Sequence, residues 1–174
     1  LSESKYAGFL VNIPSDEPHY QLAQELLSAS QSSLSDQLPR IIISVPGTGG
    51  SVGLDLEVVV DMWERELGVV VDFQQVEWAT FLKDLDKQTF QSFAGLGWEA
   101  DYPDPQDFLD VLFHSDSDIN HGAYSNPAAD KILEEARTLK DPLERYRLYS
   151  QAERLIVEDA AWVPMWYTGE RYVL

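Results

Sequence analysis

Cysteine is absent from this chain, basic residues are few, and no long apolar run occurs. Without cysteine, the sequence excludes disulfide bonds and thiolate metal sites. No stretch reaches about 18 apolar residues, the length from which a membrane-spanning helix is predicted. Lys and Arg number 12 against 30 Asp and Glu, which gives a net charge of −18. Because nucleic acids bind to a concentrated basic face, we expect no nucleic-acid partner.

The residues that are present indicate a folded chain. Of 174 residues, 44% are hydrophobic and 11% are aromatic, which is enough for a domain with a core and too apolar for a disordered chain. The acid excess favours an amine-bearing ligand only weakly, because surface acids mainly keep a protein soluble. The chain begins at Leu1 without an initiator Met or a signal peptide. We therefore expect residues 1–174 to form a single domain from a longer protein, with residues 1–15 as an extended entry segment.

An α/β fold is predicted from the first half of the chain. Residues 41–45 are a continuous β-branched run, typical of a strand covered on both faces. A helix over residues 52–67 follows, with Gly68 as its C-cap, and residues 69–73 form the next strand. Another strand is expected to run from residue 93 to Trp98. This βαβ arrangement predicts a mixed, mostly parallel sheet flanked by helices.

Apolar residues at helical spacing predict the remaining helices and their buried faces. Two of these helices begin with a cap followed by proline, at Asn126 and at Asp141. Residues 162–167 are expected to form a closing strand. The predicted inward residues, helix by helix, are Tyr20, Ala23, Leu26 and Leu27; Val58, Val59, Met62, Trp63 and Leu67; Trp78, Phe81, Leu82 and Leu85; Phe108, Leu109, Leu112 and Phe113; Ile132, Leu133, Ala136 and Leu139; and Leu143, Tyr146, Tyr149, Ala152, Leu155 and Ile156.

The segment over residues 97–105, with the sequence GWEADYPDP, is the candidate functional site. A strand that ends on Trp98 would place an aromatic ring beside the Asp101 carboxylate at the edge of the sheet. In open α/β sheets, ligands bind at such an edge. Asp104 is the expected N-cap of the next helix, with Pro105 at its first position. Trp98 taken alone would more often be a core residue, because large aromatic side chains mostly supply buried area.

The glycine-rich loop over residues 47–53 is similar to two phosphate-binding fingerprints and satisfies neither. The dinucleotide pattern needs glycine where Val52 stands, and the P-loop needs Lys and Ser or Thr where Leu54 and Asp55 stand. We interpret the loop as a plain turn and predict no cofactor.

A calcium loop is suggested by the spacing of Asp116, Asp118 and Asn120. His121 stands in place of the required glycine, and Pro127 in place of the twelfth-position acid. A transition-metal site at His114 and His121 lacks a third ligand. We therefore predict a solvated loop that holds no metal.

Four aspartates, at positions 101, 104, 107 and 110, suggest the paired carboxylates of a hydrolase. Capping and the helix dipole explain Asp104 and Asp107, and Asp110 is expected on the solvent side. Only Asp101 has no structural role. No Ser, His and Asp grouping resembles a nucleophilic triad. We predict a protein without catalytic activity, and a hydrolase that uses Asp101 with Glu99 or Asp104 is the alternative.

Four motifs in this order resemble a known family. They are WEADYPDP at residues 98–105, YSNPAAD at 124–130, RYRLY at 145–149 and WVPM at 162–165. Together they resemble the extracellular solute-binding proteins of ABC importers, in the branch that handles di- and oligopeptides, over residues 16–174. The resemblance implies a periplasmic-binding-protein type II fold, in which this chain forms most of the second lobe. It also implies a role in capturing cargo.

The resemblance further implies the roles of the site residues. The site would line the cleft between two lobes, where Asp101 pairs with the α-amino group of a bound peptide. Backbone groups of Gly97, Trp98 and Glu99 would bond to the extended peptide, as in strand addition. Tyr102 would close over the ligand or pack on a neighbouring proline. The Glu99 side chain has no role that the pattern demands.

The expected partners also follow from the resemblance. They are a peptide ligand, the first lobe of the same chain and the subunits of an ABC permease. The location would be periplasmic or extracellular, with the membrane reached only through an anchor or the permease. Oligosaccharides, nickel chelates and haem remain alternative ligands within the family. A pure interaction domain, which binds through an apolar patch near Trp162 and Trp166, is a further alternative.

Overall fold

The chain divides into two compact units, between Trp98 and Glu99. The structure is a computed structural model, which describes residues 20–31 and 38–165. Residues 13–98 are called the sheet unit, and the unit that begins at Glu99 is called the helical unit. The assignment of the whole chain to one domain, the second lobe of a larger protein, stays a prediction.

Some predicted features lie outside the described residues. These are the entry segment 1–15 and the part of the closing strand that includes Trp166. The described part of that closing strand, residues 162–165, has no strand structure.

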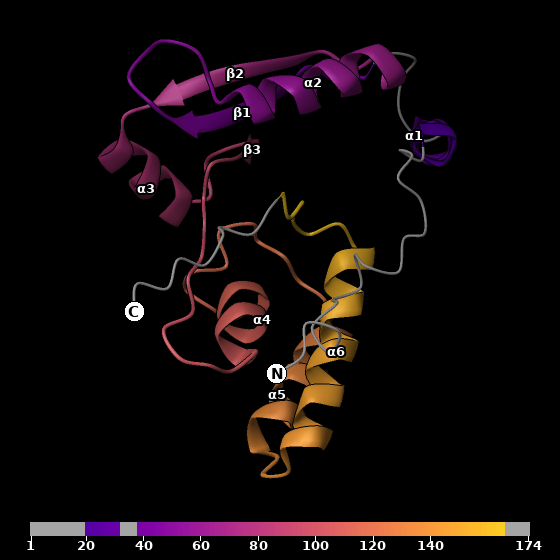
Figure 1. Cartoon of the computed structure of the whole chain (residues 1–174), viewed down its shortest axis with the longest axis vertical. Helices are drawn as coiled ribbons and strands as arrows, with labels where there is room; N and C mark the ends of the chain where they lie inside the picture. The colour runs from indigo at the N-terminus through magenta and orange to yellow at the C-terminus, as the bar shows by residue number, and fades with distance from the viewer. Residues whose placement is uncertain (1–19, 32–37, 166–174) are drawn as a thin grey trace, which may run out of the picture. The chain divides into compact units, whose positions relative to one another are not determined.

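A parallel sheet of three strands forms the centre of the sheet unit (Figure 1). Strand β1, Ile41–Pro46, lies between β2, Val71–Val76, and β3, Ser92–Phe93. Its β-branched residues suit a central strand, and Ile43, Ser44 and Val45 are buried. Helix α2, Leu54–Leu67, connects β1 to β2. The predicted α/β class and the βαβ unit are therefore confirmed.

Helix α2 packs on the sheet with Trp63 and Leu67, as predicted, and also with Val60, which was not predicted. Val60 is buried, in one cluster with Ile43, Val45 and Val71. Val58 was expected inside and is 51% exposed. Residues two apart on a helix point in nearly opposite directions, so the burial of Val60 turns Val58 outward. The helix ends as predicted at Gly68, which has a φ of 67° and donates its N–H to the carbonyl of Glu64.

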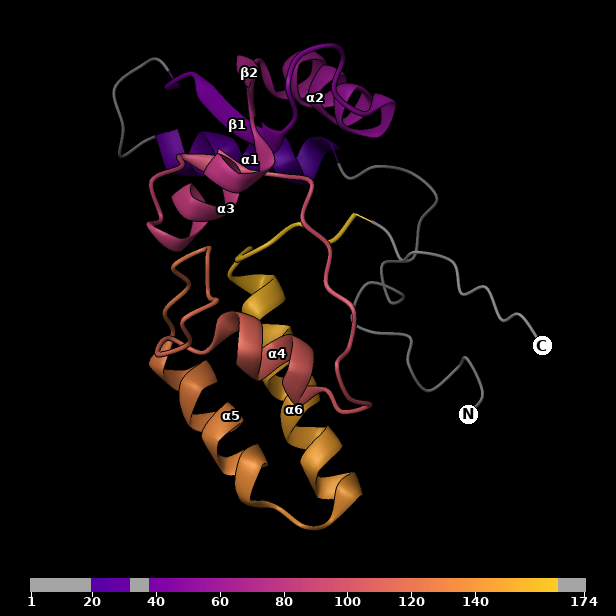
Figure 2. The ribbon, with the colours of Figure 1, turned by 90° about the vertical axis from the view of Figure 1, so that its left-hand side faces the viewer.

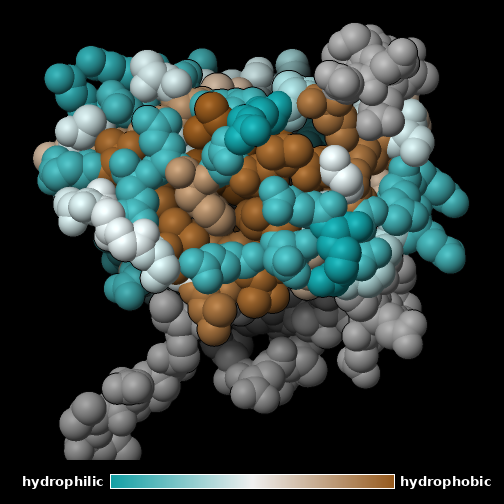
Figure 3. All heavy atoms as spheres, turned by 90° about the horizontal axis from the view of Figure 1, so that it is seen from above, coloured by the Kyte–Doolittle hydropathy of each residue, from teal (hydrophilic) through white to brown (hydrophobic). Residues whose placement is uncertain are grey.

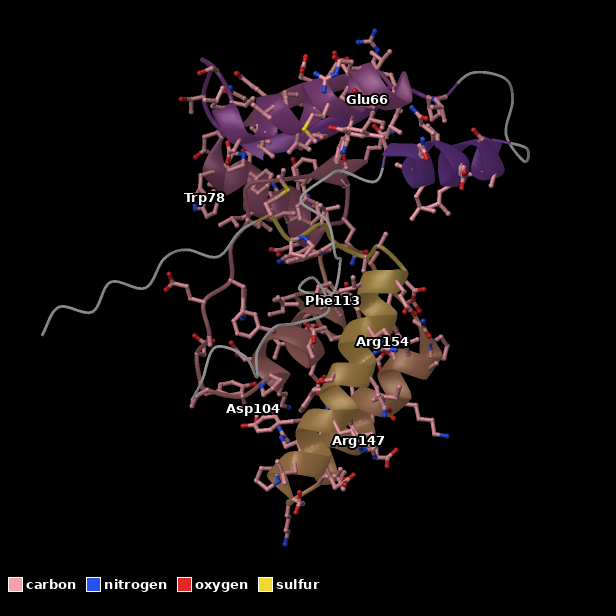
Figure 4. The ribbon with its side chains drawn as sticks, turned by 45° about the vertical axis from the view of Figure 1, so that its right-hand side comes forward. Glu66, Trp78, Asp104, Phe113, Arg147 and Arg154 are labelled. Atoms are coloured by element: carbon pink, nitrogen blue, oxygen red, sulfur yellow. The ribbon has the colours of Figure 1, made fainter. Side chains whose placement is uncertain are left out.

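Helices α1, Tyr20–Gln31, and α3, Trp78–Asp86, complete the sheet unit. Helix α3 begins at Glu77, whose carboxylate accepts the N–H of Thr80. Phe81 and Leu85 are fully buried, as expected. Three side chains expected inside are exposed instead: Leu26, Trp78 and Leu82. Trp78 is labelled in Figure 4.

Apolar side chains reach the surface of the sheet unit. Figure 3 shows them gathered on one face of this unit, among polar side chains. The exposed large apolar residues of the sheet unit include Leu54, Val58 and Val70.

Strand β3 ends five residues earlier than predicted, at Phe93 instead of Trp98. The last hydrogen bond along it joins the N–H of Ala94 to the carbonyl of Ser44. Gly95 then adopts a left-handed φ of 84°, which turns the chain out of the extended conformation. Trp98 therefore lies in an irregular segment that follows the strand.

Three helices form the helical unit: α4, Gln106–Phe113; α5, Pro127–Thr138; and α6, Pro142–Glu158 (Figure 2). The predicted caps of α5 and α6 are confirmed. Asn126 accepts the N–H groups of residues 128 and 129, and Asp141 those of residues 143 and 144. Each cap is followed by a proline whose missing N–H needs no partner.

The core of the helical unit lies where α5 and α6 meet. Leu133 and Ala136 of α5 pack with Leu148, Tyr149 and Ala152 of α6.

A second cluster in this unit joins α4 to the end of α6. Leu112, Phe113 and Ile156 are buried there, and the ring of Phe113 lies 5.1 Å from that of Trp162 (Figure 4 labels Phe113). Phe108, Leu143 and Tyr146 were expected inside and are exposed instead.

Candidate ligand-binding site

The carboxyl ends of the three parallel strands lie at one edge of the sheet unit, at Pro46, Val76 and Phe93. The chain leaves β1 for β2 on one side and later returns to β3 on the other side. The end of β1 is therefore a topological switch point, where ligands bind in open α/β sheets.

A pocket of about 300 Å³ lies at this switch point. Parts of the segment 45–56 line it, together with Gln75 and Gly95. The side-chain amide of Gln75 accepts the N–H of Gly49 at 2.6 Å and donates to the carbonyl of Gly50 at 2.8 Å. Both glycines have left-handed φ angles, 115° and 98°, which side chains rarely adopt.

Sequence reasoning interpreted this loop as a plain turn and missed the pocket. Gln75 gives no distinct signal in the sequence, because Asp72 and Gln74 of the same strand are polar as well. Asp55 also lines the pocket. A carboxylate there opposes the binding of phosphate at the start of α2, although the helix dipole would favour an anion.

Gly97 and Trp98 lie just beyond this edge, in the irregular segment that follows β3. A Cβ atom added to Gly97 would meet nothing within 4 Å, so its backbone is open to approach. Trp98 is 37% exposed, so part of its surface is accessible to a ligand. Their contact with a ligand stays a prediction.

Asp101 lies in the helical unit, on a bend before α4, and is exposed. Its backbone N–H donates to the carboxylate of Asp107 at 3.0 Å. Asp107 is 1% exposed, so this hydrogen bond fixes the bend to the interior. Glu99 and Tyr102 are also exposed.

The N-cap of α4 is Pro105, one residue later than the predicted cap Asp104. Asp104 still accepts the N–H of Gln106 at 2.9 Å. Its two oxygens also accept hydrogen bonds from Arg145 of α6, at 2.9 and 3.1 Å. Burial raises the pKa of Asp104, but the hydrogen bonds from Arg145 and Gln106 and the charge of Arg145 outweigh it, so that the pKa falls below its usual range.

Arg145 is held from two further sides. It donates to the carbonyl of Ala136 at 2.8 Å, and its guanidinium lies 5.1 Å from the centre of the Tyr149 ring. Tyr149 is fully buried, and burial raises its pKa to about 12.

Asp110 was expected on the solvent side, and that prediction is wrong. Asp110 is 4% exposed and is paired with Arg137 of α5 through both of its oxygens. A charge cannot be buried without such a partner, and the sequence did not reveal that α5 supplies one.

The contacts of these acids oppose the hydrolase alternative that pairs Asp101 with Asp104. The Asp104 carboxylate is bound to Arg145, and the Asp107 carboxylate is buried and accepts a backbone N–H. A carboxylate bound by an arginine is a poor proton acceptor, so Asp104 does not suit an acid and base pair with Asp101. Asp101 is the exposed aspartate among the four.

The loop before α5 is held by its own hydrogen bonds and is less solvated than predicted. Asn120 is buried and donates to the carbonyls of His114 and Tyr124. His114 is also buried. Its Nδ1 accepts the N–H of Asp116, and its Nε2 lies 3.5 Å from a carboxylate oxygen of Glu134.

The described residues contain no cluster of three or more His, Cys, Asp or Glu side chains that could hold a metal ion. Over the same part of the chain, no helix is both long enough and apolar enough to cross a membrane.

Comparison with known proteins identifies the family. The family model "Bacterial extracellular solute-binding proteins, family 5 Middle" matches residues 3–120, which is more than half of the chain. The chain belongs to this family. The resemblance of its motifs to solute-binding proteins is thereby confirmed.

Three curated proteins are similar to parts of the chain. The periplasmic oligopeptide-binding protein OppA of Salmonella typhimurium is 38% identical over 109 residues, 63% of this chain and 20% of its own length. The periplasmic murein peptide-binding protein MppA of Escherichia coli is 30% identical over 96% of this chain and 32% of its own. A probable deoxycholate-binding periplasmic protein of Escherichia coli, YgiS, is 34% identical over 60% of this chain and 19% of its own.

Solved structures of this family share the fold. The unliganded open form of the MppA murein tripeptide-binding protein matches with a TM-score of 0.69 and 29% identity, over 82% of this chain and 27% of that chain. The predicted periplasmic-binding-protein type II class is therefore confirmed. The chain spans 19% to 32% of the length of the curated relatives described above.

Proposed function

We propose that this chain is the second lobe of a solute-binding protein that captures di- or oligopeptides for an ABC importer. One observation supports it most: Asp101 is an exposed carboxylate on a bend that is anchored to buried groups. Every linear peptide with a free N-terminus carries an ammonium group that such a carboxylate can bind. The peptide-binding relatives OppA and MppA support the same ligand class.

The other candidate residues would contact the parts that all peptides share. Backbone groups at Gly97, Trp98 and Glu99 would pair with the extended peptide main chain, as a strand does at a sheet edge. The open space around Gly97 favours such an approach. Trp98 and Tyr102 would cover the ligand with aromatic area, and Glu99 adds negative charge. Binding through shared atoms would allow many side chains.

The proposed role is transport without catalysis. A first lobe would complete the cleft, and hinge closure between the lobes would trap the peptide for delivery to the permease. The protein would work in the periplasm or outside the cell, attached to the envelope through an anchor or the permease. The relatives OppA of Salmonella typhimurium and MppA of Escherichia coli are named as periplasmic proteins, which supports that location.

Calorimetry of the full-length protein with two ligands tests the proposal. Trialanine with a free amine should bind at least about 30-fold more tightly than its N-acetyl form, because a charged hydrogen bond contributes about 2 kcal/mol. Equal affinities would contradict the role of Asp101 as the ammonium partner. If neither ligand binds, the proposal that the protein captures peptides of three residues is contradicted.

A non-peptide ligand is the second candidate, because YgiS is described as a probable deoxycholate-binding protein. Deoxycholate is an anion, and the exposed Glu99 and Asp101 would repel it. Titration of the same protein with deoxycholate separates the two candidates. Tight binding of deoxycholate without binding of trialanine would favour the second one.

A further inference from the structure

The bend that carries Asp101 is attached to the helical unit at both of its ends. At one end, the N–H of Asp101 donates to the buried carboxylate of Asp107. At the other end, the N–H of Asp104 donates to the carbonyl of Tyr102 at 2.8 Å. The Asp104 carboxylate then accepts the N–H of Gln106, the first residue of α4. The orientation of the exposed Asp101 carboxylate therefore depends on where Asp104 is held.

Arg145 holds Asp104 from a helix that lies 41 residues further along the chain. Its Nε and Nη2 donate to the two oxygens of Asp104. Two parallel hydrogen bonds of this kind fix the orientation of the carboxylate relative to the guanidinium. Arg145 is itself fixed by the carbonyl of Ala136 and the Tyr149 ring, and its side chain is only 16% exposed. Helix α6 is thus joined to the bend by a rigid connection.

Arg145 also decides which acid of the bend has a cation as its partner. It neutralises Asp104, and Asp101 remains as an exposed carboxylate three residues away. Without Arg145, two carboxylates three residues apart in the sequence would lack a cation. Their repulsion would move the bend, and a ligand ammonium could then bind at either of them.

We propose that Arg145 is a positioning residue for ligand binding, and that it acts through Asp104 to orient the Asp101 carboxylate toward the ligand amine. The inference rests on the proposed function and goes beyond it, because Arg145 itself contacts no ligand. It predicts that selectivity for a free N-terminus depends on a side chain of α6.

The same helices provide a matched control. Arg137 of α5 makes an equivalent two-oxygen pair with Asp110 of α4. That pair joins two helices and neutralises a buried acid, and it is not attached to the bend at residues 101–104. Arg137→Met should therefore destabilise the unit without changing how a ligand amine is recognised.

Calorimetry on the full-length protein gives the dissociation constants of trialanine and of N-acetyl trialanine. The amine selectivity is the dissociation constant of the acetylated peptide divided by that of the free peptide. We expect Arg145→Met to lower this ratio by about tenfold or more, the loss expected when a charge-assisted contact is misplaced. The affinity for the acetylated peptide should change by less than about twofold, because that peptide makes no ammonium contact. Arg145→Lys, which keeps the charge and loses the two-oxygen geometry, should give an intermediate ratio. Arg137→Met should keep the wild-type ratio.

Each outcome decides between the two proposals. A wild-type protein without amine selectivity contradicts the proposed function itself. A selective wild type with unchanged selectivity in Arg145→Met and Arg145→Lys contradicts the positioning role alone. Equal loss of affinity for both peptides also contradicts it, because that is the result of general damage to the fold. If Arg145→Met does not fold, then Arg145→Lys and Asp104→Asn decide, with the same ratio as the readout.

Discussion

Four aspartates at three-residue intervals, from Asp101 to Asp110, differ in their partners rather than in their chemistry. Asp104 and Asp110 are each bound by an arginine, and Asp107 is buried and accepts a backbone N–H. Asp101 is exposed. At the scale of single residues, the candidate site is therefore defined by which carboxylates have been neutralised by the protein.

The Asp104–Arg145 pair predicts a dependence of stability on pH. The folded-state pKa of Asp104 is lowered from 3.8, so the folded protein binds the proton less readily than the unfolded chain. The stabilisation is therefore complete above the unfolded pKa and is lost as the pH falls through the folded pKa. Thermal unfolding should show Asp104→Asn less stable than wild type at pH 7, with a difference that shrinks at pH 3.

The exposed loop residue Asp118 supplies the control for that measurement. Asp118→Asn should change the melting temperature little at either pH, because substitutions of exposed surface residues rarely change the stability of a protein. A difference between Asp104→Asn and wild type that stays the same from pH 7 to pH 3 would contradict the ion pair.

At the scale of the elements, the helical unit depends on one face of each helix. On α6, the buried residues Leu148 and Tyr149 are followed at intervals of three and four by Ala152 and Ile156. The predicted stripe began at Leu143, six residues before Tyr149, and a step of six residues rotates about 120° around a helix. Leu143 is 79% exposed for that reason.

Two leucines of the same unit test this assignment of faces. Leu133→Ala removes a fully buried side chain and should cost about 2–5 kcal/mol of unfolding free energy. Leu143→Ala should cost less than about 0.5 kcal/mol, because an exposed side chain buries little on folding. Chemical denaturation of both variants gives the two values. Similar values for both variants would show that the faces are assigned wrongly.

Local signals predicted the elements, and long-range contacts decided their faces. Three helix ends were predicted correctly from local signals, because these signals act within one turn of the helix. They are a cap followed by proline at Asn126 and at Asp141, and the C-cap glycine at Gly68. The end of β3 was misplaced because Gly95 alone turns the chain. The burial of Asp110 could not be predicted, since its partner Arg137 lies 27 residues away on another helix.

The candidate site was predicted from sequence only in part. The motif around Asp101 stood out because no cap or core position explained that carboxylate. The connection through Asp104 to Arg145 left no local signal, because it spans 41 residues. The pocket at the glycine loop was missed because its order comes from Gln75, on a neighbouring strand.

At the scale of the whole molecule, the chain matches only part of each relative, and the candidate residues belong to both compact units. Residues 1–174 alone should therefore bind peptides poorly, because the proposed first lobe supplies the other side of the cleft. Calorimetry of this chain and of the full-length protein with trialanine compares them directly. A nanomolar complex with residues 1–174 alone would contradict the two-lobe account.

The most direct measurement concerns Asp101 in the full-length protein. Calorimetric titration with trialanine should show that Asp101→Ala weakens binding by about 2 kcal/mol or more, since it removes the charged partner of the peptide amine. Asp118→Ala, at an exposed aspartate of the loop before α5, should leave the affinity unchanged. An Asp101→Ala protein that binds trialanine as tightly as wild type would contradict the account.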